Sequence, residues 1–294
     1  MADRTAKNLI EYVLFLILVG VVRLLPRKVA LALGAGLGRL ARRLQPRRVR
    51  IARENLAAAF PQMPEKEMDA TIAEIFGHLG KSGIEMLLLN RLRTRADLDR
   101  HISVTGLEHL QEAFARGKGV FILTGHVGFW EVGTFLLPIL GYPVDFVAKR
   151  MKNPYIEDYV RRLREAAGGR VLDAKHGARR IMKALSENRA VALLLDQHTT
   201  PHRAVQVPFF GRPAWTTPII AQIAMKQGVP VVPSFSWRLP DGRYQVEFHK
   251  PLLLSGAPGP AAVTANTALL TEKIEAAVRR DISQWFWVHR RWRE

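Results

Sequence analysis

The sequence predicts an α/β fold in which a mostly parallel central sheet is flanked by helices, with an N-terminal hydrophobic helical membrane anchor. From about residue 101, short β-rich apolar runs alternate with helical stretches, which is typical of parallel sheets with crossover helices. The first sixty residues instead read as helices. No internal repeat or low-complexity linker interrupts the 294 residues. We therefore divide the chain into a membrane anchor with a basic interfacial helix, 1–45, and one α/β domain, 46–294.

The expected strands are short apolar segments rich in β-branched residues, and we take them as buried strands. They are Ile102–Val104, Val120–Leu123, Val144–Val147, Val191–Leu195 and Val229–Phe235. Tyr244–Phe248 alternates apolar and polar residues, which predicts a late strand, antiparallel at an edge of the sheet. Helices are expected at 47–59, 65–90, 106–116, 130–140, 154–167, 177–188, 215–227 and 261–281.

The N-terminal anchor is predicted from the almost wholly apolar segment Leu9–Leu25, which only Glu11 and Arg23 interrupt. A bilayer crossing needs roughly 20 such residues. The basic residues follow the apolar run, so the positive-inside tendency places the rest of the chain in the cytoplasm. Residues 29–44 suit an amphipathic helix at the membrane surface. A buried core helix is the alternative reading of the apolar segment.

The charge of the chain points to a polyanionic partner. The formal net charge is +18, and the segment from Arg23 to Arg53 contains no Asp or Glu. Such a segment favours nucleic acid or an anionic membrane surface. We expect the membrane and no nucleic acid, because the basic excess follows an apolar run and no groove-reading or base-stacking element is evident. The absence of cysteine excludes disulfides, thiol nucleophiles and Cys-based zinc sites.

The first candidate site is the stretch ILTGHVGFWEVG, 122–133. His126 follows a predicted strand, and Glu131 falls in the first turn of the next helix. Gly125 and Gly128 permit a tight bend and a close approach of substrate to the backbone. In that geometry the carboxylate can hold the imidazole in one tautomer, which makes His126 a candidate general base. A surface histidine beside a helix-terminal glutamate is the plainer interpretation.

Other polar residues end neighbouring predicted strands, where α/β sheets place their sites. Arg150 follows 144–147 and is suited to gripping a phosphate. Asp196 follows 191–195, although a capping or turn aspartate explains it equally well. A metal between His198 and His202 is disfavoured because Pro201 breaks the helical spacing, and we expect neither metal nor cofactor. Gly34-Ala-Gly-Leu-Gly38 indicates close helix packing rather than a dinucleotide site, since no strand precedes it.

Several blocks together resemble a known family. Gly125-His-Val-Gly-Phe-Trp-Glu131 resembles the His-x4-Asp/Glu block of glycerolipid-type acyltransferases, in the form used by the late acyltransferases of lipid A biosynthesis. Also similar are Arg150 with Asn153-Pro154, Asp196-Gln197, the segment 207–213 and the tail QWFWVHRRW, 284–292. The blocks recur in order over nearly the whole chain. The block departs from the family where Phe129 replaces an Asn, and His198 replaces a residue that is often acidic.

The resemblance implies a lipopolysaccharide-biosynthesis enzyme at the cytoplasmic face of the bacterial inner membrane. It would transfer a fatty acyl chain from acyl carrier protein to a hydroxyl of a lipid A precursor, with a lipid acceptor and an anionic membrane surface as further partners. His126 and Glu131 are then catalytic, and Arg150, Asn153, Asp196, Gln197, Gly125 and Gly128 contact substrate. A lysophospholipid, an amino-acid lipid or a glycolipid remains open as the acceptor. The tail tryptophans and arginines, 285–293, either form an interfacial aromatic belt or pack on the domain.

Overall fold

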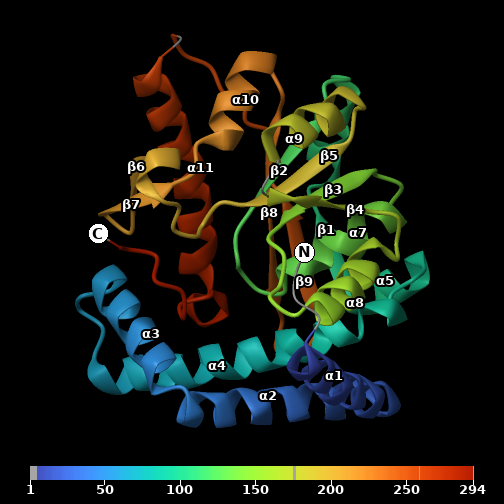
Figure 1. Cartoon of the computed structure of the whole chain (residues 1–294). Coiled ribbons are helices and arrows are strands. Elements are labelled where there is room, and N and C mark those ends of the chain that lie inside the picture. The colour runs from blue at the N-terminus through green and yellow to red at the C-terminus, as the bar shows by residue number, and fades with distance from the viewer. Residues whose placement is uncertain (1–4, 175–176, 258, 294) are drawn as a thin grey trace.

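A seven-stranded sheet forms the centre of the molecule, in the order β1-β9-β8-β2-β5-β3-β4 (Figure 1). The computed structural model describes residues 5–174, 177–257 and 259–293. Every neighbouring pair is parallel except β8 and β9, which confirms the predicted mostly parallel α/β sheet. The strands are β1 Ile102–Thr105, β2 Val120–Thr124, β3 Val144–Ala148, β4 Arg170–Asp173, β5 Ala190–Leu194, β8 Val231–Arg238 and β9 Tyr244–Phe248.

Three strands differ from the expectation. The late strand β9 is antiparallel to β8, but it lies inside the sheet because β1 pairs with its other side. Strand β4 escaped prediction because its four residues include two charged ones at the ends. The separate hairpin of β6 Val205–Phe209 and β7 Arg212–Thr216 also escaped, since prolines stand in both strands.

Helices cover both faces of the sheet, and side chains of successive residues in one strand point to opposite faces. In β2, Phe121 and Leu123 belong to one hydrophobic cluster, while Val120 and Ile122 belong to the other. The helices of this domain are α5 Arg95–His101, α6 Leu107–Ala115, α7 Gly133–Ile139, α8 Pro154–Glu165, α9 Gly177–Ser186, α10 Ile219–Gln227 and α11 Pro260–Arg280. The predicted helix at 215–227 begins later, because β7 ends at Thr216.

Four helices form a separate layer along the lower side of the view in Figure 1: α1 Ala6–Leu24, α2 Arg27–Leu44, α3 Pro46–Ala59 and α4 Glu65–Leu87. Helices α2 and α4 pack closely through glycines. A Cβ atom on Gly38 would overlap the backbone carbonyl of Phe76. The glycine cluster of α2 therefore serves helix packing, as the sequence predicts.

The expected membrane-spanning anchor is not supported and is corrected here. Among the described residues, no helix combines the length and the apolar character that a bilayer crossing requires. Helix α1 contains Lys7, Glu11 and Arg23, and part of its surface packs inside the protein. Val19 and Val22 are buried in a cluster with residues of α4, and Tyr12 stacks on Tyr155 of α8 at 5.6 Å.

The division of the chain at residue 45 stays a prediction, and residues 1–4 lie outside the described part. Helix α2 contacts the rest of the molecule beyond its glycines. The Arg27 guanidinium donates to Glu85 of α4 at 2.8 Å and to the carbonyl of Gly242, next to β9, at 2.9 Å.

Candidate active site

The turn after β2 carries His126 into the largest described cavity. Gly128 has φ +59°, and a Cβ atom there would overlap the carbonyl oxygen of Ser236 in β8. A Cβ atom on Gly125 would come within 2.9 Å of Ile274 and 3.3 Å of the Asp196 carboxylate. Both glycines are therefore required by close packing, and they shape the turn rather than leaving it open.

Asp196 is the carboxylate that contacts His126. Its Oδ1 accepts a hydrogen bond from Nδ1 of the imidazole at 2.8 Å, and its Oδ2 accepts one from the His126 backbone N–H at 2.7 Å. The sheet register explains the contact. Thr124 of β2 pairs with Leu194 of β5. His126 and Asp196 each come two residues later, so they lie side by side where these two neighbouring strands end.

The environment keeps Asp196 ionised. Its side chain is 1% exposed. Burial alone would raise its pKa, but the charge and the N–H groups of His126, together with the Trp285 indole N–H, outweigh burial and lower the pKa to about 2. The indole Nε1 donates to Oδ2 at 2.7 Å. Because an ionised carboxylate can only accept, Nδ1 of His126 carries a proton, and in the neutral imidazole the lone pair is then on Nε2.

Nε2 of His126 points toward the cavity and is contacted by Gln197, the residue that follows Asp196 after β5. The Gln197 side-chain amide lies 3.1 Å from it and donates its N–H. Trp130 and Phe286 enclose the ring, with centroids 4.9 and 5.7 Å from that of the imidazole. The ring is 18% exposed, so a ligand in the cavity can reach it.

Two further elements hold the turn. The Nε2 of His78, on α4, donates to the carbonyl of Gly128 at 3.0 Å, and the N–H of Gly128 donates to the carbonyl of Gln284 at 2.8 Å. Burial, helped by the charge of Arg238, lowers the pKa of His78 to about 4, so His78 is neutral at pH 7. Since the Gly128 N–H is occupied, this amide is not free to bind an oxyanion.

Glu131 has a different partner from the one the sequence suggests. It lies in the short 3₁₀ turn Trp130–Val132, and its carboxylate accepts two hydrogen bonds from Arg164 of α8, at 2.5 and 2.9 Å. No hydrogen bond joins Glu131 to His126 among the described residues. Burial alone would lower the pKa of Arg164, but Glu131 outweighs it and raises the pKa. Arg164 is therefore a fixed cation in the wall of the cavity.

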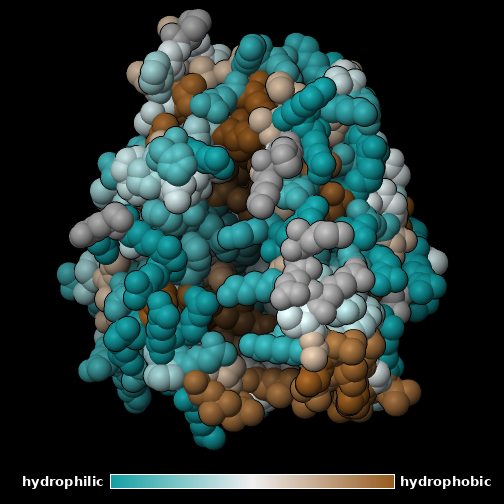
Figure 2. Space-filling view, viewed as in Figure 1, coloured by the Kyte–Doolittle hydropathy of each residue, from teal (hydrophilic) through white to brown (hydrophobic). Residues whose placement is uncertain are grey.

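The cavity has a volume of about 1280 Å³ and opens on the face seen in Figure 2, which is hollowed near its middle. His126, Glu131, Arg164 and Gln197 all line it. Most of the remaining wall is apolar and comes from strands β2, β3 and β5 and from helices α7 and α8, with residues such as Ile122, Leu136, Phe146, Val160 and Leu193. The cavity thus combines a few polar groups with a mostly apolar wall that suits a hydrocarbon chain.

Two of the expected substrate contacts lie elsewhere. Arg150 is at the predicted sheet edge, but its side chain is 75% exposed and pairs with Asp173, the last residue of β4, at 2.9 Å. Asn153 caps α8 and donates to the Asn8 carbonyl at 2.8 Å and to Glu11 at 3.0 Å. Neither lines the cavity. Their role in substrate binding remains a proposal without contact to the site.

Sequence reasoning missed Arg164, His78 and the role of the tail. Trp285 and Trp287 are buried, and Arg291 is fully buried, where it donates to the Trp215 carbonyl at 2.8 Å. The tail therefore packs inside the domain and forms no exposed aromatic belt. The concentration of tryptophan and arginine at 285–292 was the available signal. The described residues contain no cluster of three or more His, Asp or Glu placed to hold a metal.

Comparison with known proteins gives the family. Residues 3–294 match the family model described as bacterial lipid A biosynthesis acyltransferase. The chain is 29% identical to the lipid A biosynthesis lauroyltransferase of Escherichia coli over 92% of this chain and 87% of that protein. It is 25% identical to a lipid A biosynthesis acyltransferase of Haemophilus influenzae over 87% and 78% of the two chains.

A relative with another named substrate is also similar. The chain is 29% identical to the phosphatidylinositol mannoside acyltransferase of Mycobacterium tuberculosis, over 63% of this chain and 60% of that protein. The family model spans nearly the whole sequence. Of the blocks quoted from the sequence, His126, Glu131, Gln197 and Phe286 line the cavity. The chain belongs to the bacterial lipid A biosynthesis acyltransferase family.

Proposed function

We propose that this protein transfers a fatty acyl chain from an acyl carrier protein thioester to a hydroxyl of a lipid A precursor, at the cytoplasmic face of the inner membrane. The observation that carries the proposal is the hydrogen bond between His126 Nδ1 and the buried carboxylate of Asp196, 2.8 Å long, with His126 in the wall of a mostly apolar cavity. Family membership supports the reaction class.

In this mechanism His126 is the general base. Nε2 takes the proton of the acceptor hydroxyl after that hydroxyl displaces the Gln197 amide. The oxygen attacks the thioester carbonyl, the C–S bond of the tetrahedral intermediate breaks, and His126 returns the proton to the departing thiolate. Asp196 holds the tautomer and stabilises the imidazolium, the part first considered for Glu131. Positioned proton transfer of this kind contributes about 10²- to 10⁴-fold.

Glu131 acts in this proposal through Arg164. The bidentate ion pair fixes the planar guanidinium in the cavity wall, where one side remains available for an oxygen-rich acceptor group or for developing negative charge. Asp196 and Gln197 keep their proposed place in the site. Gly125 and Gly128 contribute by allowing the turn rather than by touching substrate.

The second candidate keeps the chemistry and changes the acceptor. The similarity to the phosphatidylinositol mannoside acyltransferase favours a glycolipid hydroxyl as the alternative.

The test uses the purified full chain with acyl carrier protein thioesters of several chain lengths. Each donor is offered with a lipid A precursor, a phosphatidylinositol mannoside or a lysophospholipid, and products are identified by mass spectrometry. We expect one acyl chain added to the lipid A precursor, with release of free carrier thiol. Transfer only to a mannoside or a lysophospholipid would replace the acceptor, and no transfer to any hydroxyl would reject the proposal. The variant His126→Ala is the matched control.

A further inference from the structure

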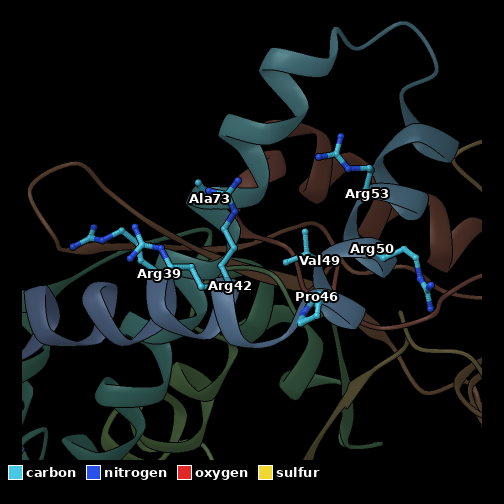
Figure 3. A pocket seen from close by; sticks show the side chains of 8 residues that line it. Arg39, Arg42, Pro46, Val49, Arg50, Arg53 and Ala73 are labelled. Carbon is cyan, nitrogen blue, oxygen red and sulfur yellow. The ribbon is translucent and has the colours of Figure 1, made fainter.

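A second hollow lies outside the active-site cavity. It has a volume of about 600 Å³ and is lined by Arg39, Arg42, Arg43, Pro46, Val49, Arg50, Arg53 and Ala73; we call it the arginine pocket. Figure 3 shows Arg42 of α2 reaching toward Ala73 of α4 and Arg53 of α3 pointing into the space between these helices, while Arg39 and Arg50 point outward. It shares no lining residue with the active-site cavity.

The two hollows lie against different sides of α4. Ala73 lines the arginine pocket, and Leu79 lines the active-site cavity. Residues six apart on a helix point about 120° away from each other, since each residue turns by about 100°. The helix therefore separates the two sites, and the arginine pocket is not part of the acyl-transfer centre.

The positive charge of this pocket is only partly compensated. Arg53 pairs with Asp69 and with Glu65, and Arg50 approaches Glu54 at 3.7 Å. Arg39, Arg42 and Arg43 make no ion pair or side-chain hydrogen bond with any described residue. Three guanidinium groups on two turns of one helix repel one another unless an anion binds between them, and their planar geometry matches phosphate oxygens.

The apolar surface of α2 indicates where that anion comes from. Leu37, Leu40 and Leu44 are exposed, and the helical repeat places them in one stripe. Arg43 and Arg39 follow along one side of this stripe, about 60° and 100° from Leu40, whereas Arg42 lies about 160° from Leu40 on the far side of the helix. Helix α1 continues this exposed apolar surface with Leu9, Val13, Leu14, Ile17 and Leu24. Figure 2 shows the apolar residues along the lower edge of the molecule, where Figure 1 places α1 and α2.

We propose that the arginine pocket binds the phosphate headgroup of an anionic phospholipid while the apolar stripe of α2 lies in the outer part of the same leaflet. An apolar stripe bordered by arginines is the pattern of helices that lie in the membrane surface. The inference rests on the proposed action at a membrane, and it adds a lipid that is neither donor nor acceptor of the acyl group. An acidic protein surface is the competing occupant, but it would leave the leucine stripe unexplained.

The first experiment measures sedimentation of the full chain with vesicles of phosphatidylcholine, alone or with about a third of phosphatidylglycerol. The variant R39Q/R42Q/R43Q is compared with R179Q/R180Q/K226Q, which removes the same charge from exposed positions on α9 and α10. We expect the pocket variant to lose affinity for the anionic vesicles on the order of 100-fold at about 0.1 M salt, from about five-fold per charge. The control variant should stay within about two-fold of the unaltered protein if charge acts locally.

Four outcomes overturn the proposal. Equal losses in both variants would mean that net charge alone binds the vesicles. Unchanged binding of the pocket variant would mean that the pocket holds no lipid. If the pocket variant loses affinity for acyl carrier protein in solution but keeps its preference for anionic vesicles, the pocket is a protein-docking site. Inorganic phosphate at millimolar concentration serves as the free-anion probe: if it displaces the protein from vesicles as well as phosphatidylglycerol micelles do, the pocket selects phosphate and not a lipid.

Acyl transfer in detergent micelles separates this inference from the proposed function. The pocket variant should keep its turnover there, within about two-fold, because the cavity is untouched. Loss of vesicle binding with intact turnover supports a separate lipid site. If the unaltered protein shows no acyl transfer but the vesicle results stand, the proposed reaction fails while the lipid site survives.

Discussion

Two carboxylates belong to the candidate site, and they differ in how they are held: Glu131 lines the cavity, whereas Asp196 lies behind His126. Asp196 is fully enclosed and accepts three hydrogen bonds, from the ring and backbone of His126 and from Trp285. The Glu131 carboxylate accepts only from Arg164 among the residues that the structure describes. Contacts from β5, the tail and α4 support the His126–Asp196 pair. The Glu131–Arg164 pair joins only the turn after β2 to α8. The comparison shows that the carboxylate that orients His126 comes from a neighbouring strand end and not from a residue that is close to His126 in the sequence.

The largest expected effect comes from Asp196→Asn. The new amide would accept from Trp285 and offer an N–H to Nδ1, which places the ring proton on Nε2 and removes the base. We expect kcat to fall about 10³- to 10⁴-fold, as in other sites that lose the correct tautomer. Turnover of acyl carrier protein thioester by the purified variant measures it, with thermal melting as the control for folding. Near-normal turnover would remove Asp196 from the mechanism.

Glu131→Gln should have a smaller effect that depends on Arg164. If Glu131 acts by fixing the guanidinium of Arg164, Glu131→Gln should lower kcat/KM about 100-fold. Arg164→Gln should lower kcat/KM by a similar factor. The double variant should then be little worse than either single one, since both remove the same unit. Independent, additive losses would show that Glu131 has a role apart from Arg164, including the direct contact with His126 that its position in the sequence suggests.

Substitutions of His78 test whether α4 supports the turn that carries His126. His78→Phe removes the donor to the Gly128 carbonyl, while His78→Gln keeps an N–H there. Leaving a buried carbonyl unpaired costs about 1–3 kcal/mol of folding stability, and we expect kcat of the Phe variant to fall about 10-fold with KM unchanged. Rescue by the Gln variant separates hydrogen bonding from packing. A Phe variant with full turnover would mean that the turn needs no support from α4.

The burial of His78 also predicts how folding stability depends on pH. The folded pKa of His78 is about 4, below its ordinary value of 6.5, so the unfolded chain binds the proton more readily between these two values. Stability is therefore present above pH 6.5 and is lost as the pH falls to 4, by about 3 kcal/mol for this residue. Denaturant unfolding of the unaltered protein and of His78→Gln should show a shallower slope for the variant. Parallel curves would contradict the assignment.

The smallest effect is expected at Arg150. Its side chain is mostly exposed and pairs with Asp173 outside the cavity, and exposed ion pairs contribute roughly 0–1 kcal/mol. Arg150→Ala should change kcat/KM by less than about two-fold, measured with the lipid A precursor as acceptor. A rise in KM of ten-fold or more would restore Arg150 as an acceptor-binding residue and would require the acceptor to extend beyond the cavity.

Much of this arrangement is legible in the sequence, because strand ends in a parallel sheet gather at one edge. His126 and Asp196 each follow a predicted apolar strand, and both were candidates before the strand order was known. What the sequence lacked was that β2 and β5 are neighbours, which turns two separate candidates into a hydrogen-bonded pair. The partner of Glu131 depends on where α8 packs, and no local pattern around Arg164 encodes that.

The N-terminal region shows the opposite limit. Hydropathy along Leu9–Leu25 predicted a membrane span, yet Val19 and Val22 are buried against α4, and no described helix meets the requirements of a span. A run of apolar residues indicates that a segment is removed from water. It does not indicate whether the segment is buried in protein or in lipid. Helix α2 illustrates both, because its glycines face α4 while its leucines stay exposed.

The hydrogen bond from Trp285 to Asp196 also sets an order of events during biosynthesis. Translation proceeds from the N-terminus, and the strands that carry His126 and Asp196 are made well before residue 285. A nascent chain can thus assemble its sheet while the aspartate still lacks one of its three donors and the turn still lacks the Gln284 carbonyl. We expect the growing polypeptide to be inert toward acyl thioesters until this late segment has left the ribosome and folded back.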